Sequence, residues 1–189
     1  VTAFDPDESL DYTYTWSSGG TVLGTGLSFD ASQHTLSPGD PLTCMTTVTD
    51  SDGAFDTAIE TITLENRAPS VSDAVFAPSS IFTDTLVTVN ATISDPDGDP
   101  IALVEYEWHI SDASNNYNDT IVQTSTSNTL NGLQHFDKDD ILFVLITPSD
   151  GQLTGSTFTS ASHTIENAPP TAPEVSVSPN PAIEGVDDL

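Results

Sequence analysis

The sequence contains almost no positive charge. Its 189 residues include two basic side chains, Arg67 and Lys138, against 29 aspartates and glutamates. The formal net charge of −27 argues against a nucleic-acid partner, because almost nothing is present to neutralise phosphates. An anionic membrane surface is disfavoured for the same reason. The acidic residues therefore have two interpretations: a solvated, self-repelling surface, and a smaller set of carboxylates that bind divalent cations.

Long apolar runs and cysteine pairs are missing as well. No window approaches the roughly 18 apolar residues of a membrane-spanning helix, so we expect no membrane insertion within this sequence. No secretory signal opens the chain, and the single cysteine, Cys44, cannot form an internal bridge. Threonine, serine and aspartate are abundant, a composition typical of extracellular β-repeat proteins. We therefore expect an extracellular or cell-surface location.

What the sequence does contain is a repeat. Residues 92–108 read TISDPDGDPIALVEYEW, and residues 2–16 read TAFDPDESLDYTYTW. A second echo joins ENRAP at residues 65–69 to ENAPP at residues 166–170. Such self-similarity at a long, nearly fixed spacing indicates a tandem array.

The echoes also predict the borders of the repeats. We expect residues 1–66 to form a repeat that lacks its first strand and residues 67–167 to form a complete repeat. Residues 168–189 would then supply the first strand of a further repeat. The sequence thus looks like about two periods of a longer array. Its last segment either continues into the next repeat or adds as a strand to a neighbouring copy, and both alternatives remain open.

Apolar residues alternate with polar ones in most segments, which predicts strands. Trp16 and Trp108 fall on inward-facing positions and are expected in the core. No helical stripe of useful length is present. The second repeat should contain strands near residues 70–77, 86–94, 103–111, 119–125, 127–130, 141–148 and 156–166. We therefore predict an all-β chain of tandem immunoglobulin-like antiparallel β-sandwiches, with about seven strands per repeat.

The order of the short motifs resembles a known group of repeats. E-N-x-A-P, D-P-D-G-D, Y-x-W, G-D and D-G, followed again by E-N-A-P, resemble the tandem Ig-like or cadherin-like repeats of large bacterial and archaeal surface proteins. The chain is also similar to polycystic-kidney-disease-type repeats, although their W-D-F-G-D-G run is absent. The resemblance covers nearly the whole chain. It implies an adhesin, a stalk, a cell-surface layer or an extracellular filament.

The resemblance also bears on Cys44. In relatives, the cysteine that ends G-D-x-L-T-C often bridges to the second strand. The resemblance therefore implies a disulfide partner for Cys44 that would precede Val1. The alternative is that Cys44 is a small buried apolar residue, a role that free cysteine fills well.

The acidic turns carry the candidate metal site. In such a sandwich, the loops after the second and sixth strands lie at one end, where the preceding linker also enters. Oxygen ligands that converge from three segments suit calcium better than magnesium, and the ion would fix two repeats at one angle. The expected ligands are Glu65, Asn66, Asp95, Asp97, Asp99 and Asp150 at the second repeat, and Asp5, Asp7, Glu8 and Asp52 at the first. The alternative is that aspartate, proline and glycine simply make good turns.

Other signals are short. Asn90-Ala91-Thr92 and Asn118-Asp119-Thr120 are N-glycosylation sequons, so Asn90 and Asn118 are candidate glycosylation sites. The four histidines, His34, His109, His135 and His163, lack ligand spacing and are expected at the surface or rim.

No feature of the sequence points to catalysis. Serines are plentiful, but no Gly-x-Ser-x-Gly elbow or phosphate-binding glycine loop accompanies them, so we expect no enzyme activity. The leading hypothesis is a structural repeat of an extracellular filament, stalk or adhesin, whose partners are neighbouring copies or repeats of itself. The alternative is a carbohydrate- or receptor-binding module of a larger secreted protein, with Tyr117 as its candidate contact. A third hypothesis is a subunit that self-assembles by strand donation.

Overall fold

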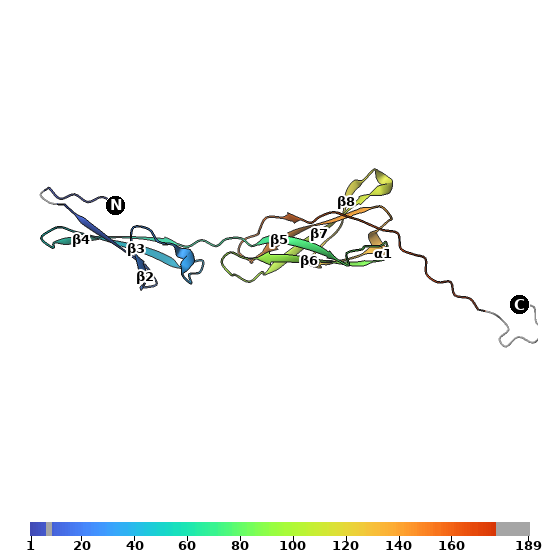
Figure 1. Cartoon of the computed structure of the whole chain (residues 1–189), viewed down its shortest axis with the longest axis horizontal. Helices are drawn as coiled ribbons and strands as arrows, with labels where there is room; N and C mark the ends of the chain where they lie inside the picture. The colour runs from blue at the N-terminus through green and yellow to red at the C-terminus, as the bar shows by residue number, and fades with distance from the viewer. Residues whose placement is uncertain (7–8, 177–189) are drawn as a thin grey trace, which may run out of the picture.

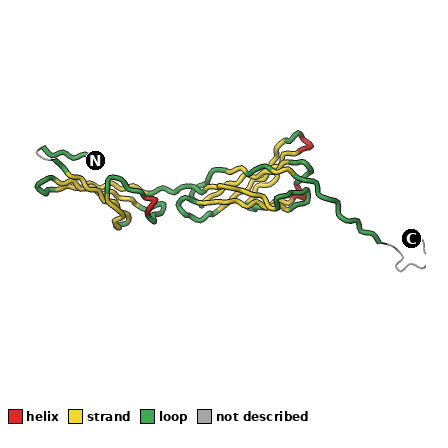
Figure 2. Tube along the Cα trace, in the orientation of Figure 1, coloured by secondary structure: helices red, strands yellow, loops and turns green. Residues whose placement is uncertain are grey.

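The computed structural model describes residues 1–6 and 9–176, and it is built almost entirely of antiparallel strands. Figure 1 shows two groups of strands that follow one another along the long axis. The first unit holds β1 (Asp11–Ser18), β2 (Thr21–Thr25), β3 (Pro41–Thr49) and β4 (Phe55–Thr63). Helical turns are confined to connections, as Figure 2 shows: η1 (Ala31–Gln33), η2 (Ala113–Asn115) and α1 (Gly132–His135). The predicted all-β class is confirmed.

The second unit is a sandwich of two sheets. One sheet has the order β5-β6-β9, from β5 (Ser70–Ala77), β6 (Leu86–Ser94) and β9 (Thr129–Asn131). The other has the order β11-β10-β7-β8, and β12 also pairs with β10. Its strands are β7 (Leu103–Asp112), β8 (Asn118–Ser125), β10 (Ile141–Ser149), β11 (Phe158–Thr159) and β12 (His163–Thr164). This is the immunoglobulin-like arrangement that the alternation predicted.

The structure departs from the sequence prediction at two connections. Residues 156–166 were expected to form one strand, yet they form two short pieces, β11 and β12. Ser160 lies at the break, where its hydroxyl accepts a hydrogen bond from the Val144 N–H at 3.0 Å and so replaces part of the ladder. Asn131-Gly132 is a pair typical of turns, yet it begins the short helix α1. The Asn131 side chain caps this helix by accepting a hydrogen bond from the Leu133 N–H at 3.2 Å.

The core of the second unit lies between its two sheets. β7 pairs with β10 so that Trp108 is opposite Val144 and Tyr106 is opposite Ile146. Trp108, Val144 and Ile146 are completely buried, and Phe76 from the other sheet stacks on Trp108 with ring centroids 6.0 Å apart. The predicted core position of Trp108 is confirmed. Each such side chain stabilises the fold by roughly 1.5–3 kcal/mol through removal of apolar surface from water.

The first unit repeats half of this sandwich. Its sheet has the order β2-β1-β3-β4, and Trp16 lies opposite Cys44 as Trp108 lies opposite Val144. The turn that precedes β3 in the first unit also recurs before β10 in the second unit. The Ser37 N–H donates to Asp40 Oδ2 at 2.8 Å, and the Asp137 N–H donates to Asp140 Oδ2 at 2.9 Å. The two units therefore share strand order, register and turn chemistry.

No second sheet lies over this first sheet in the described part of the chain. Trp16 is therefore only half-buried, and its expected place in a closed core is wrong. Its ring stacks on Phe29 with centroids 5.5 Å apart, and its indole N–H donates to the Gly26 carbonyl at 2.9 Å. No helix among the described residues is long and apolar enough to span a membrane.

The difference in burial between the two units predicts a difference in mutational cost. We expect Ile146→Ala to lower the free energy of unfolding of the second unit by about 2–5 kcal/mol, because it opens a cavity in a closed core. The change Ile62→Ala on β4, on the face that carries Cys44 and Trp16, removes a side chain that is 56% exposed, so we expect a change within about 0.5 kcal/mol. Urea unfolding followed by fluorescence measures both. Equal losses would contradict the assignment of a closed core to the second unit alone.

Candidate functional site

The segment that joins the two units meets two loops of the second unit. The Asn66 side-chain amide donates to Asp150 Oδ2 at 2.8 Å, and the Arg67 backbone N–H donates to Asp97 Oδ2 at 2.7 Å. Asp97 lies in the loop after β6, and Asp150 lies in the loop after β10. Three segments that are far apart in the sequence therefore converge at the joint.

Each acidic loop is held by one oxygen of its own carboxylate. Asp95 Oδ1 accepts hydrogen bonds from the N–H groups of Asp97 at 2.7 Å and Asp99 at 3.2 Å. Asp150 Oδ1 accepts from the N–H groups of Gln152 at 2.7 Å and Leu153 at 2.6 Å. The Leu153 N–H and the Asn66 amide together lower the pKa of Asp150 from its ordinary value. In both aspartates, Oδ1 is thus used to hold the turn. Only Oδ2 is available to serve as a ligand or to bind the linker.

The remaining oxygens at the joint include three that are buried and have no donor among the described residues. They are Asn66 Oδ1, Asp95 Oδ2 and Asp99 Oδ2. A buried acceptor without a partner costs about 1–3 kcal/mol, and more when it is charged. Bound water or a bound cation relieves such a cost, because either brings positive charge to the lone pairs. These three oxygens belong to residues that were predicted as metal ligands.

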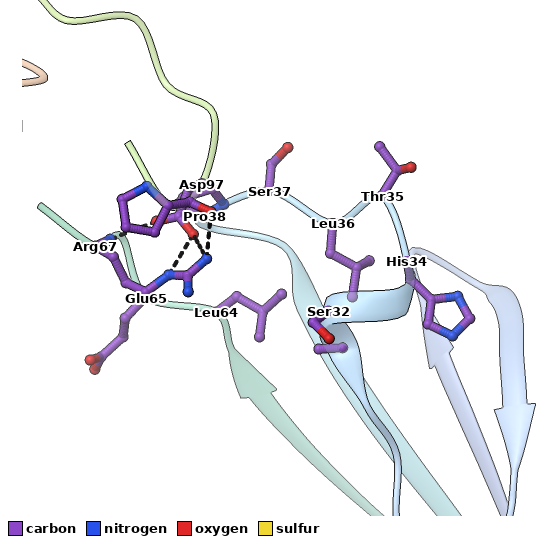
Figure 3. A pocket seen from close by; sticks show the side chains of 12 residues that line it. Ser32, His34, Thr35, Leu36, Ser37, Pro38, Leu64, Glu65, Arg67 and Asp97 are labelled. Carbon is purple, nitrogen blue, oxygen red and sulfur yellow. Dashed lines mark hydrogen bonds and ion pairs between the residues drawn. The ribbon is translucent and has the colours of Figure 1, made fainter. Parts of the chain in front are cut away.

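Asp97 has a different partner, which the sequence did not reveal. The Arg67 guanidinium donates to Asp97 Oδ1 through Nη2 at 2.6 Å and through Nε at 2.8 Å, and Nη2 also donates to the Pro96 carbonyl at 2.7 Å (Figure 3). The Asp97 side chain is only 10% exposed. Arg67 lowers the pKa of Asp97 from its ordinary value, chiefly through these side-chain hydrogen bonds. Arg67 therefore supplies a built-in cation at this loop.

The joint also encloses a pocket of about 450 Å³ (Figure 3). Its walls come from the 31–38 turn of the first unit, the linker and the loop after β6. Glu65 lies on this wall, but it is exposed and its carboxylate points away from the Arg67–Asp97 pair. The structure thus places Glu65 on the wall of this pocket, exposed to solvent.

Two of the four ligands expected at the first unit, Asp5 and Asp52, lie among the described residues. Asp7 and Glu8 lie outside the described residues. Asp5 lines a hollow of about 260 Å³ together with Asp50 and Asp56, whereas Asp52 is exposed and does not line it. Across residues 1–6 and 9–176, no three His, Cys, Asp or Glu side chains form a metal-holding group.

His109 was expected at the surface or rim, and this expectation is wrong. The side chain is buried, with 8% of the residue exposed, because Phe143 stacks on its ring at a centroid distance of 4.6 Å. Its Nε2 lies 3.0 Å from Glu107 Oε1, and its Nδ1 lies 3.0 Å from Asp119 Oδ2. Strand alternation placed His109 correctly on the outer face, but it could not show that neighbours cover it there.

The other predicted sites lie on the surface or on the open sheet. Asn90 and Asn118 are both exposed, as glycosylation would require. Cys44 is half-buried and forms no disulfide with any described residue. Whether it has a partner elsewhere stays a prediction.

Comparison with known proteins gives little. No protein-family model matches the chain, and no curated protein matches it. Chains of solved structures do match, among them one described as "Structures of Clostridium thermocellum CbhA fibronectin(III)-like modules". It is 8% identical to this chain, the match covers 93% of this chain and 88% of that one, and the TM-score is 0.34. Because these values are low, the likeness carries no argument. The fold assignment rests on strand order and register.

The Arg67–Asp97 pair predicts a pH effect. We expect Arg67→Gln to raise the pKa of Asp97 toward its ordinary value, because the guanidinium no longer favours the charged carboxylate. A depressed folded-state pKa contributes stability above the unfolded value of about 3.9 and loses it as the pH falls through the folded value. The unfolding free energy of the native chain should therefore fall more steeply below about pH 4 than that of the variant.

NMR titration of the aspartate carboxyl carbons measures both pKa values directly. Asp112 is the internal control, since the hydroxyl and N–H of Ser114 are what mainly lower its pKa. The pKa of Asp112 should not change in Arg67→Gln. An Asp97 pKa that is equally low in the variant would contradict the role given to Arg67.

Proposed function

We propose that the chain is a non-enzymatic structural module of an extracellular or cell-surface filament, stalk or adhesin, in which calcium at the joint stiffens neighbouring repeats. The observation that carries this proposal is the set of unpartnered buried oxygens on Asn66, Asp95 and Asp99. They lie where the linker from the first unit meets two loops of the second. A cation bound at this place would fix the angle between the two units.

The donor set fits a hard cation. Calcium takes six to eight oxygen ligands with tolerant geometry, and it accepts carboxylates, amide oxygens, backbone carbonyls and water together. Asn66, Asp95 and Asp99 would hold the ion, and Asp150 supplies charge next to them through its bond to Asn66. Asp97 is the exception among the predicted ligands of the second unit, because both of its oxygens already accept hydrogen bonds from Arg67. Bound calcium would supply positive charge that joins linker and loops.

Electrostatics supports the proposal that a cation stabilises this joint. The chain carries a formal net charge of −27, and two of its acidic loops face each other at the joint. The Asp150 carboxylate opposes the ionisation of Asp97, so the two loops repel each other. One arginine offsets part of this repulsion, and a divalent ion would offset more. The module would then be stiff with calcium and looser without it.

A second candidate function is favoured by one surface feature. Tyr117 is 53% exposed at the tip between η2 and β8, with a left-handed backbone φ of 57°. Its N–H donates to the Asp112 carbonyl at 2.8 Å, which fixes the tip that presents the ring. An exposed aromatic ring on a fixed loop suits stacking against a sugar, as in a carbohydrate-binding module of a larger secreted protein.

A glycan array separates the two functions. The structural role predicts no glycan ligand. A ligand whose binding falls at least about tenfold in Tyr117→Ala would establish the carbohydrate-binding role instead. Leu133→Ala is the control, since it removes another exposed side chain, 76% exposed, without touching the Tyr117 loop.

The calcium joint predicts a ligand-dependent rise in stability. We expect the unfolding midpoint of the second unit to rise with calcium and to return with excess chelator, because an ion that binds the folded form stabilises it by mass action. The gain is about 2.7 kcal/mol when calcium is present at 100 times its dissociation constant. Differential scanning calorimetry measures the shift.

The double change Asp95→Asn and Asp99→Asn should remove this shift. In chelator, we expect the double variant to be at least as stable as the native chain, because two like charges are gone and the new amide oxygen at position 95 can still accept the turn hydrogen bonds. Asp84→Asn is the charge-matched control on an exposed residue of the same unit, and it should keep the full calcium response. Identical melting curves with calcium and with chelator would show that the acidic turns are only turns.

A further inference from the structure

We propose that Arg67 is a positioning residue that holds the hinge between the two units when no ion is bound, so that part of the stiffness of the joint does not need calcium. The inference rests on the proposed structural role, because a fixed hinge matters in a filament, stalk or adhesin. It deepens that role by naming a side chain of the chain itself that fixes the hinge. Three observations support it: the shortness of the hinge, the contacts of Arg67 and the burial of its partner.

The hinge is short because both of its ends are anchored. At the first unit, the Leu64 N–H donates to the Asp40 carbonyl at 3.0 Å. At the second unit, the Pro69 side chain is completely buried. The Pro69 carbonyl oxygen also packs against Gly155, where a Cβ atom would lie 2.0 Å from it. Residues 65–68 are therefore the hinge, and whatever holds them sets the angle between the units.

Within the hinge, Arg67 makes more hydrogen bonds to the second unit than Asn66 does. The Arg67 backbone N–H donates to Asp97 Oδ2 at 2.7 Å, and its Nε and Nη2 donate to Asp97 Oδ1 at 2.8 and 2.6 Å (Figure 3). Nη2 also donates to the Pro96 carbonyl at 2.7 Å. Asn66 donates one hydrogen bond, to Asp150. The main chain and the side chain of Arg67 thus hold the hinge to the loop after β6.

The partner of Arg67 is largely covered, which distinguishes this contact from an ordinary surface ion pair. The Asp97 side chain is 10% exposed, whereas that of Arg67 is 63% exposed. Exposed pairs contribute little unless their geometry is fixed, and here two side-chain nitrogens and a backbone N–H of one residue bind one carboxylate. If the hinge undocked, both oxygens of Asp97 would lose these donors. The contact therefore opposes undocking without any divalent ion.

Arg67 brings two properties to the hinge, its charge and its planar set of donors. Lysine keeps the charge, but its ammonium group does not reproduce the arrangement of Nε and Nη2. The contacts favour the planar set, because three hydrogen bonds from the guanidinium reach two acceptors, Asp97 and Pro96. We therefore expect Arg67→Lys to loosen the hinge although the net charge stays at −27.

Limited digestion with trypsin tests this expectation, because trypsin cuts after basic residues and the chain has two of them. Arg67 lies in the hinge, and Lys138 lies between α1 and β10 of the second unit. In excess chelator, hinge cleavage should be at least about tenfold faster in Arg67→Lys than in the native chain, because the hinge must undock before it is cut. Each rate is divided by that of a synthetic peptide of residues 61–72 with the same residue at position 67. This division removes the preference of trypsin between arginine and lysine.

Lys138→Arg is the matched control. It exchanges the same two side chains outside the joint, at a residue whose side chain is 60% exposed, and it should leave hinge cleavage unchanged. Equal hinge rates in the native chain and in Arg67→Lys would overturn the proposal. A native hinge that is cut as fast as the peptide in chelator would overturn it too. Faster cleavage after Lys138 in Arg67→Lys would show general unfolding of the second unit and also count against a role in the hinge.

Nitrogen-15 relaxation of the intact chain measures the stiffness of the hinge itself. In chelator, the rotational correlation times of the two units should differ less in the native chain than in Arg67→Lys, and equal differences would overturn the proposal. Added calcium should bring the two units of Arg67→Lys back toward common tumbling. If calcium changes nothing in either chain while the difference in chelator remains, calcium stiffening is rejected and the role of Arg67 stands. The two proposals therefore fail by different results.

Discussion

The constraint on which this structure depends is that each sheet has one apolar face that must leave water. In the second unit two sheets satisfy the constraint together, and Trp108 with its neighbours becomes completely buried. In the first unit the same register produces the same face, but the described residues supply no second layer. The half-burial of Trp16 and the exposure of Ile62 on β4 follow directly. The two units therefore differ in whether a second sheet covers the apolar face, and not in how the individual strands pair.

A second constraint is charge. A chain with 29 acidic and two basic residues must separate its carboxylates, pair them or bind cations. At the joint the aspartates show several of these features within one small region. One oxygen of each loop aspartate holds the local turn, Arg67 holds Asp97, and three further oxygens stay buried without a donor. The joint is thus the place where the acidic composition acts on the geometry of the molecule.

Much of the second unit could be predicted from alternation alone, because a period of two defines both the strand and its buried face. β5 and β6 begin and end where the pattern predicted, and Trp108 is buried as expected. The errors have a common origin. Ser160 broke a predicted strand through a side-chain hydrogen bond, and Phe143 buried His109 on a face that alternation assigns to solvent. Both depend on a residue from another strand, which the local pattern does not contain.

The sequence by itself determined the all-β class, the recurrence of short motifs, the inward faces of the strands of the second unit and the acidic composition of the turns, because each is a property of local spacing. Only the tertiary structure decided which oxygens of those turns are already used. It paired Asp97 with Arg67 and left Asn66, Asp95 and Asp99 with unpartnered oxygens. It also left the first sheet uncovered. The physical reason is that hydrogen-bond satisfaction and burial depend on which distant segments meet, and no local pattern records that meeting.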